Sequence, residues 1–119
     1  MARAATTSDA FNAVAEPRRR EIIEVLALGD THNVGDIARK LRMPQPAVSK
    51  HLGVLRKVGL VTVLKAGQQR LYSLNAKPLK PVHDWVGMFE KFWDDQLKAI
   101  KDAAERKARE MAANKKPNP

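Results

Sequence analysis

Apolar residues recur at helical spacing near the start of the chain, with turn-forming residues between the runs. Ser8 is a common helix-capping residue and predicts a short helix to about Ala15. Pro17 suits the first turn of a second helix, because its missing N–H is not needed there. That helix runs to about Leu28, where Gly29 provides a stop. The pattern therefore predicts two consecutive helices.

The next apolar runs predict a helix-turn-helix. Asn33, followed three residues later by Asp36, resembles a capping box and predicts a short third helix. A fourth helix begins at Pro44, which is tolerated only in a first turn, and runs to Val58 before Gly59. Its apolar positions at helical spacing are Val48, Leu52 and Leu55. About three residues separate the third and fourth helices, as is typical of a helix-turn-helix.

Two extended runs follow. The first spans 60–65 and is rich in Val, Leu and Thr, and the second spans 70–74. They flank a tip at 66–69, so the pair predicts a β-hairpin with a glycine-containing turn, a wing. Leu71 and Tyr72 are adjacent and face opposite sides of the ribbon, so one of them is partly solvated or covered by another element.

The rest of the chain reads as one long helix. Pro78 and Pro81 fit its first turn, and no further proline occurs before about Met111. A helix over about 79–111 would be roughly 50 Å long, more than a small domain needs for itself. We therefore predict one domain over 8–111, mainly α with a small β-hairpin, in which a winged helix-turn-helix precedes a C-terminal dimerisation helix. Residues 1–7 and 112–119 are expected to be flexible.

The chain is strongly basic. It carries 22 Lys and Arg against 13 Asp and Glu in 119 residues, a formal net charge of +9. This excess favours a polyanionic partner, nucleic acid first and an anionic membrane surface second, over a protein that merely carries surplus lysine. Cysteine is absent, which excludes disulfides, thiolate metal sites and thiol redox sensing. Because no apolar run is long enough for a membrane span or a signal peptide, we expect a cytoplasmic protein.

The helix over Pro44–Val58 carries a polar stripe that suits the major groove of DNA. Glutamine offers a bidentate amide to adenine, serine a short donor and acceptor, lysine a donor to guanine, and proline an apolar contact for a thymine methyl. The stripe holds no acidic residue; an ordinary solvated polar face is the alternative explanation. The stripe and its neighbours are Gln45, Pro46, Ser49, Lys50, Gly53 and Arg56.

Further side chains suit the DNA backbone or the minor groove, because they lie at the far end of this helix or at the hairpin tip. They are Arg56, Lys57, Lys65, Gln68, Gln69 and Arg70. His51 is either a packed histidine or a single phosphate contact. The run 18–20 places three arginines at the start of the second helix, where the helix dipole disfavours cations. Either a partner anion or simple solvation explains that run.

An apolar stripe follows the predicted C-terminal helix at helical spacing. Aromatic stripes usually form a core or a subunit interface, so we predict a homodimer interface, with a ligand pocket between the paired helices as the alternative. A membrane-surface helix is disfavoured because acidic residues dilute the polar face. The pairing would space two recognition helices about 34 Å apart. The predicted interface residues are Phe11, Val82, Trp85, Val86, Phe89, Phe92, Trp93, Leu97 and Ile100.

Together these residues resemble the ArsR family, also called ArsR/SmtB, of bacterial winged-helix repressors. The matching stretches, over most of residues 9–75, are 11–20, 45–52, 58–61, 67–72 and Leu74. The resemblance implies a homodimer that binds a partly palindromic operator on double-stranded DNA and leaves it when an inducer binds. The residues to which the resemblance assigns DNA contact are Gln45, Ser49, Lys50, His51, Gln68, Gln69 and Arg70. Gln68 stands at a wing position that is often basic in the family.

The metal sites of the family are not reproduced. Its thiolate site needs a Cys-x-Cys before an Asp, where this sequence has Asn33 and Gly35 before Asp36. At its site on the last helix, aligned on His83, the remaining positions hold Pro81, Asp94 and Leu97. Only His83 matches a ligand of that site fully, with Asp94 as a marginal second, which is too few ligands for zinc. No metal and no cofactor are therefore predicted. An inducer, if there is one, is a small organic molecule or a protein.

Two classes of function remain open at this point. The first is sequence-specific regulation of transcription, as a repressor. The second is a winged-helix protein- or RNA-interaction module whose basic face binds nucleic acid without sequence preference. An enzyme is not predicted, because the sequence holds no nucleophile-base pair, phosphate loop or ligand cluster, and its three His residues are scattered.

Overall fold

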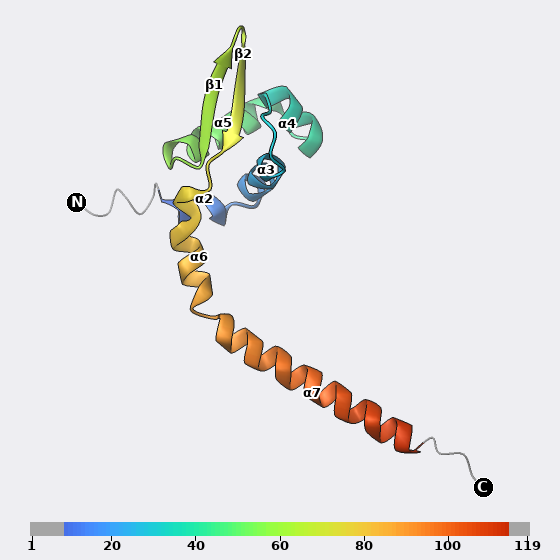
Figure 1. Cartoon of the computed structure of the whole chain (residues 1–119). Coiled ribbons are helices and arrows are strands. Elements are labelled where there is room, and N and C mark those ends of the chain that lie inside the picture. The colour runs from blue at the N-terminus through green and yellow to red at the C-terminus, as the bar shows by residue number, and fades with distance from the viewer. Residues whose placement is uncertain (1–8, 115–119) are drawn as a thin grey trace. The chain divides into compact units, whose positions relative to one another are not determined.

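A computed structural model describes residues 9–114, which divide into two compact units, one ending at His83 and the other beginning at Asp84. The elements, labelled in Figure 1, are α2 (Ala10–Ala15), α3 (Pro17–Ala27), α4 (Val34–Leu41), α5 (Gln45–Lys57), β1 (Val61–Ala66), β2 (Gln69–Leu74), the 3₁₀-helix η1 (Lys77–Leu79), α6 (Lys80–Gly87) and α7 (Glu90–Asn114). The predicted fold class, mainly helical with a two-stranded hairpin and a long C-terminal helix, is confirmed.

The first helix begins one residue later than the sequence suggested. Ser8, the predicted cap, lies outside the described residues, and Asp9 is the N-cap of α2. Its carboxylate accepts a hydrogen bond of 2.9 Å from the backbone N–H of Asn12. The end of α2 at Ala15 and the start of α3 at Pro17 agree with the prediction.

The arginine run at the start of α3 connects two helices. Nε of Arg19 donates to the carbonyl oxygen of Ala13 at 2.7 Å, and Nη1 of Arg20 donates to that of Val14, also at 2.7 Å. These carbonyls lie in the last turn of α2, where cations are favoured by the helix dipole. Arg18 instead pairs with Glu21 on its own helix. Arg19 and Arg20 therefore cap α2, a role that neither of our two explanations included.

Both ends of α4 are set by local hydrogen bonds. Asn33 is the predicted N-cap, and its Oδ1 accepts from the backbone N–H of Asp36 at 2.8 Å. The Asp36 carboxylate pairs with Arg39. At the other end Arg42 adopts a left-handed conformation, with φ 54°, and donates its N–H to the Arg39 carbonyl at 3.3 Å. The short helix therefore turns sharply into the next one.

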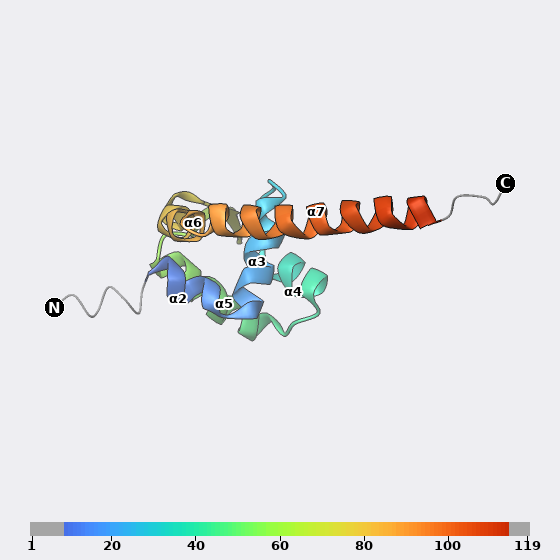
Figure 2. The ribbon, with the colours of Figure 1, turned by 90° about the horizontal axis from the view of Figure 1, so that it is seen from below.

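Helix α5 matches the predicted Pro44–Val58 to within one residue at each end, with Pro44 as N-cap and Val58 as C-cap. Together with α4 it forms the predicted helix-turn-helix. The core beneath α3, α4 and α5 is apolar, and Figures 1 and 2 show these helices grouped together. Its largest fully buried side chains are Ile22, Leu26, Ile37, Val48, Leu52, Leu55, Leu60 and Val61.

The hairpin projects from the helices as a narrow ribbon (Figure 1). Its register pairs Val61 with Leu74 and Ala66 with Gln69, so the turn is shorter than the predicted tip at 66–69. Gly67 has φ 63°, the left-handed value that tight hairpin turns require.

The base of the hairpin is secured by a residue outside it. Tyr72 is buried and Leu71 is half-buried, as their alternation requires. Tyr72 also exchanges two backbone hydrogen bonds with His32, of 3.1 and 2.8 Å. The connection between α3 and α4 thus adds a short third segment to the edge of β2, which the sequence did not reveal.

The C-terminal helical region differs from the uninterrupted helix that we predicted. α6 ends at Gly87 and α7 begins at Glu90. Between them the N–H groups of Met88 and Phe89 donate to carbonyls three residues back, at 3.2 and 3.0 Å, in place of the four-residue α-helical spacing. Glycine weakens a helix interior by about 1 kcal/mol relative to alanine, which accounts for the position of the break.

α7 continues to Asn114, beyond the predicted end near Met111. Its 25 residues correspond to a length of about 37 Å. The predicted flexible segment 1–7 lies outside the described residues, as do residues 115–119 of the predicted flexible segment 112–119, whereas residues 112–114 are helical and the prediction was wrong there. Among residues 9–114, no helix is both long and apolar enough to cross a membrane.

Candidate nucleic-acid interface

The burial of α5 separates its core residues from its polar stripe. Val48, Leu52 and Leu55 are fully buried and hold one side of the helix against α3 and α4. The predicted contact residues lie on the remaining surface: His51 is half-buried, and the exposed ones are Gln45, Pro46, Ser49, Lys50, Arg56 and Lys57. The structure therefore leaves the predicted stripe accessible to a groove.

The first turn of α5 lies against the first turn of α4. A β-carbon placed on Gly35 would be 3.5 Å from Nε2 of Gln45 and 3.7 Å from Nη1 of Arg39. The amide of the predicted base reader and an exposed guanidinium thus flank the same glycine. Arg39 was not among the predicted contact residues. The one feature of the sequence that could have pointed to Arg39 is its spacing, because a residue four positions after Gly35 lies on the same helical face.

Three cations from three elements line one cavity of about 270 Å³. Arg56 comes from the last turn of α5, Lys65 from β1 and Arg70 from β2, and Val63 completes the lining. Lys65 and Arg70 are direct cross-strand partners, an arrangement of like charges that destabilises a hairpin. An oxyanion placed between these side chains would offset that repulsion.

The sequence around the cavity contains no compensating negative charge. Neither α5 nor either strand carries an acidic residue. Gln69 is exposed at the start of β2, and Gln68 is exposed in the turn beside Gly67. The structure thus brings Arg56, Lys65 and Arg70 together, whereas the two glutamines stay at the hairpin tip and line no part of this cavity.

The predicted interface residues of the second unit are largely exposed. Phe89 packs on Trp85 and on Trp93, with ring centroids 5.3 and 6.2 Å apart. Phe92 is 59% exposed and Leu97 is 62% exposed. Ile100, Trp85 and Trp93 are also exposed, as is Phe11 in the first unit, whereas Val82 and Val86 are half-buried.

Residues 9–114 contain no group of three or more His, Cys, Asp or Glu side chains arranged to hold a metal ion. His83, the reference position for the last-helix metal site, is exposed.

Comparison of the chain with known proteins agrees with the geometry described above. Residues 16–63 match the family model "Bacterial regulatory protein, arsR family". The chain is 32% identical over 90 residues to the transcriptional repressor SdpR of Bacillus subtilis, a match that covers 76% of this chain and 99% of that protein. It is 39% identical over 88 residues to the HTH-type transcriptional regulator Rv2034 of Mycobacterium tuberculosis, covering 74% and 78%.

Solved structures show the same fold. An ArsR-like transcriptional regulator from Rhodococcus sp. RHA1 superimposes with a TM-score of 0.64 at 29% identity, covering 87% of this chain and 93% of that one. HlyU from Vibrio cholerae gives a TM-score of 0.57 at 30% identity, covering 73% and 92%.

Proposed function

Because this chain belongs to the ArsR family of bacterial regulatory proteins and is a DNA-binding transcriptional regulator, we propose that it acts as a homodimeric repressor on a partly palindromic operator. The members of the family that it matches are regulators of transcription, not enzymes. Repression follows when a regulator bound at an operator blocks access to the promoter.

The observation that carries this proposal is the cationic cavity between α5 and the hairpin. A phosphate there would be held by Arg56, Lys65 and Arg70 at once, and it would tie the end of α5 to the wing. Charge-assisted hydrogen bonds from arginine to phosphate are strong and directional. One backbone phosphate would thus fix the depth at which α5 enters the major groove.

With α5 so placed, its first turns read the bases. Gln45 offers its amide to adenine, Ser49 a hydroxyl to either partner of a base pair, and Lys50 a donor to guanine. Pro46 supplies an apolar contact for a thymine methyl. Lys57 and His51 contact the DNA backbone, and Gln68 and Gln69 at the hairpin tip reach the adjacent backbone or minor groove.

The second unit supports pairing of two copies. Monomeric proteins seldom expose a continuous apolar patch of several large side chains. Along α7, Trp93, Leu97 and Ile100 follow the alternating three- and four-residue spacing of a coiled-coil seam. Ala104 and Met111 continue it on either side of Lys107, which occupies the seam position between them. A second copy of the same helix presents a complementary seam by symmetry.

Selection of bound sequences from random DNA, followed by binding measurements on variants, tests the DNA-reading proposal. Gln45→Ala and Ser49→Ala should reduce the preference for the selected duplex over a scrambled one, whereas Arg56→Ala should weaken binding to both alike. Selection of no sequence, with equal binding to RNA and DNA, would instead support a nonspecific interaction module.

Sedimentation tests the pairing. The wild-type protein should sediment as a dimer at micromolar concentration, and Leu97→Asp should give a monomer because it places a charge in the seam. Lys98→Asp introduces the same side chain at the neighbouring outward position and should leave the dimer intact. A wild-type monomer, or equal effects of the two substitutions, would refute pairing through this face.

A further inference from the structure

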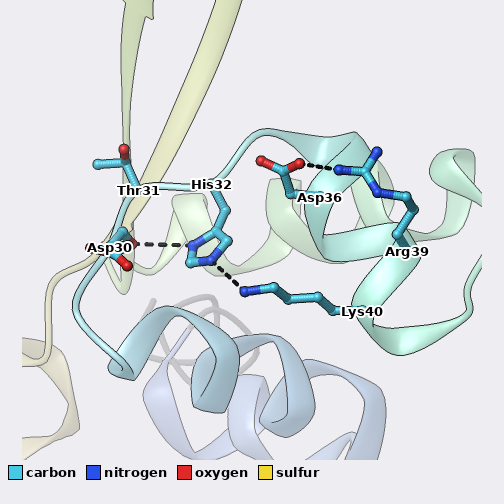
Figure 3. Close-up of a pocket in the computed structure, with 6 residues that line it drawn as sticks. All are labelled: Asp30, Thr31, His32, Asp36, Arg39 and Lys40. Carbon is cyan, nitrogen blue, oxygen red and sulfur yellow. Dashed lines mark hydrogen bonds and ion pairs between the residues drawn. The ribbon is translucent and has the colours of Figure 1, made fainter.

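A second polar cavity, of about 460 Å³, lies on the first unit, and none of the residues predicted to bind DNA lines it (Figure 3). One side is the connection between α3 and α4, and the other is a face of α4. The lining residues are Asp30, Thr31, His32, Asp36, Arg39 and Lys40. Nothing in the proposed function uses this cavity.

His32 holds the centre of the cavity in place. It is only 6% exposed, and its backbone is tied to Tyr72 by the two hydrogen bonds described above. Its Nδ1 lies 3.2 Å from the carbonyl oxygen of Asp30, and its Nε2 lies 3.1 Å from Nζ of Lys40. An imidazole protonated on Nδ1 alone satisfies both contacts, because it donates to the carbonyl and accepts from the ammonium.

The ammonium of Lys40 is thus anchored by a buried histidine and not by a carboxylate. An ammonium has three N–H donors, and His32 takes one. Within residues 9–114, the Asp30 carboxylate and the Thr31 hydroxyl have no side-chain partner, and both residues are exposed to solvent. Figure 3 shows the ion pair of Asp36 and Arg39 on the same helix, α4, as Lys40. The cavity therefore presents an unused cationic donor on α4 and an unused anionic acceptor on the opposite loop.

We propose that this cavity binds a small zwitterion of the free α-amino-acid class. Its carboxylate would accept from Lys40, and its ammonium would donate to Asp30. The volume falls within the range of roughly 300–1,000 Å³ usual for small-molecule sites, but the lining is polar and selects a charged ligand. A simple anion fits less well, because the Asp30 and Asp36 carboxylates oppose it.

Occupancy of the cavity would reach the DNA-binding surface through Arg39. This side chain lines the cavity, and its Nη1 also lies near Gly35, as does Nε2 of Gln45. A ligand carboxylate beside Lys40 attracts the Arg39 guanidinium and draws its charge away from the first turn of α5. The ligand therefore weakens DNA binding, a consequence that rests on the proposed function.

Ligand-observed NMR and calorimetry on the whole protein without DNA test the site itself. The probes are the twenty free amino acids at millimolar concentration, with acetate and ethylamine as half-ligands. At least one amino acid should bind, and each half-ligand should bind about tenfold more weakly or not at all. Lys40→Met and Asp30→Asn should each weaken binding by about tenfold or more, because each removes a charged partner.

Lys98→Met serves as the matched control, since it removes an exposed lysine from α7, far along the chain from the cavity residues, and should leave the affinity unchanged. Absence of binding by every amino acid, or equal affinity in wild type and Lys40→Met, would overturn the site. Equal affinity for acetate and for the amino acid would overturn the zwitterion as its ligand.

DNA binding to the selected duplex then tests the coupling. The bound amino acid should lower the DNA affinity of the wild type by about fivefold or more and leave that of Asp30→Asn unchanged. A ligand that binds without changing DNA affinity overturns the coupling alone. If the ligand-free wild type does not prefer the selected duplex, the proposed function is refuted. The NMR measurement is made without DNA, so it still tests whether the cavity binds an amino acid.

Discussion

Replacing Arg70 by glutamine should affect stability and DNA binding in opposite directions. Arg70 stands directly across the hairpin from Lys65, and both line the cavity with Arg56. Two unit charges about 6 Å apart in water repel by about 0.7 kcal/mol. Screening at physiological ionic strength, where the Debye length is about 8 Å, reduces this by about half. Arg70→Gln should therefore leave the free energy of unfolding unchanged or raise it by up to about 0.4 kcal/mol.

The same substitution should weaken DNA binding. If the cavity holds one phosphate, removal of a cation leaves that phosphate less neutralised, and its counterion is no longer released on binding. The slope of log affinity against log salt concentration should then fall by up to about 0.9. Affinity for the selected duplex and for a scrambled duplex should decrease by similar factors, because a phosphate contact carries no sequence information.

Urea denaturation measures the first effect, and fluorescence anisotropy over a series of salt concentrations measures the second. Arg109→Gln removes an arginine from the exposed surface of α7 and is the control for loss of charge alone. Destabilisation of Arg70→Gln by more than about 1 kcal/mol with unchanged DNA affinity would refute the reasoning. That result would show that Arg70 stabilises the hairpin and does not serve an anion.

Three further predictions concern the fold that carries the site. Leu55→Ala should lower the free energy of unfolding by about 2–5 kcal/mol in urea denaturation, because Leu55 is fully buried; a loss below about 1 kcal/mol would contradict the core assignment. Asn33→Ala removes the N-cap of α4 and should cost about 1 kcal/mol, whereas Asn33→Asp should restore most of it. Gly87→Ala should increase the helical circular dichroism signal, because a β-carbon there meets no atom within 4 Å and alanine favours helix; a decrease would show that the break needs glycine.

The helix-turn-helix was predictable because its boundaries are set by neighbouring residues. Pro44 has no backbone N–H to donate, so a helix can begin there but cannot run through it. Gly59 adopts φ 80° just after α5, where the helix ends. The apolar positions Val48, Leu52 and Leu55 recur at the helical period and are all buried. Each of these signals acts within a few residues, so the pattern alone located α5 to within one residue.

Signals that depend on distant partners were missed or left open. Arg19 and Arg20 have no visible reason to open a helix until the carbonyls at the end of α2 are seen beside them. The edge pairing of His32 with Tyr72 joins residues far apart in the chain. The interruption at Met88 and Phe89 was missed because the prediction of one long helix rested on the absence of proline and did not consider Gly87.

The sequence alone therefore determined the order of the elements up to the hairpin, the polar stripe of α5 and the basic character of the predicted DNA-binding surface, since periodicity, capping and charge are local properties. Only the tertiary structure showed that Arg56, Lys65 and Arg70 share one cavity and that Arg39 and Gln45 both lie near Gly35. These convergences depend on hairpin register and on how the helices pack. Both are set by burial of the whole core, which no single segment encodes.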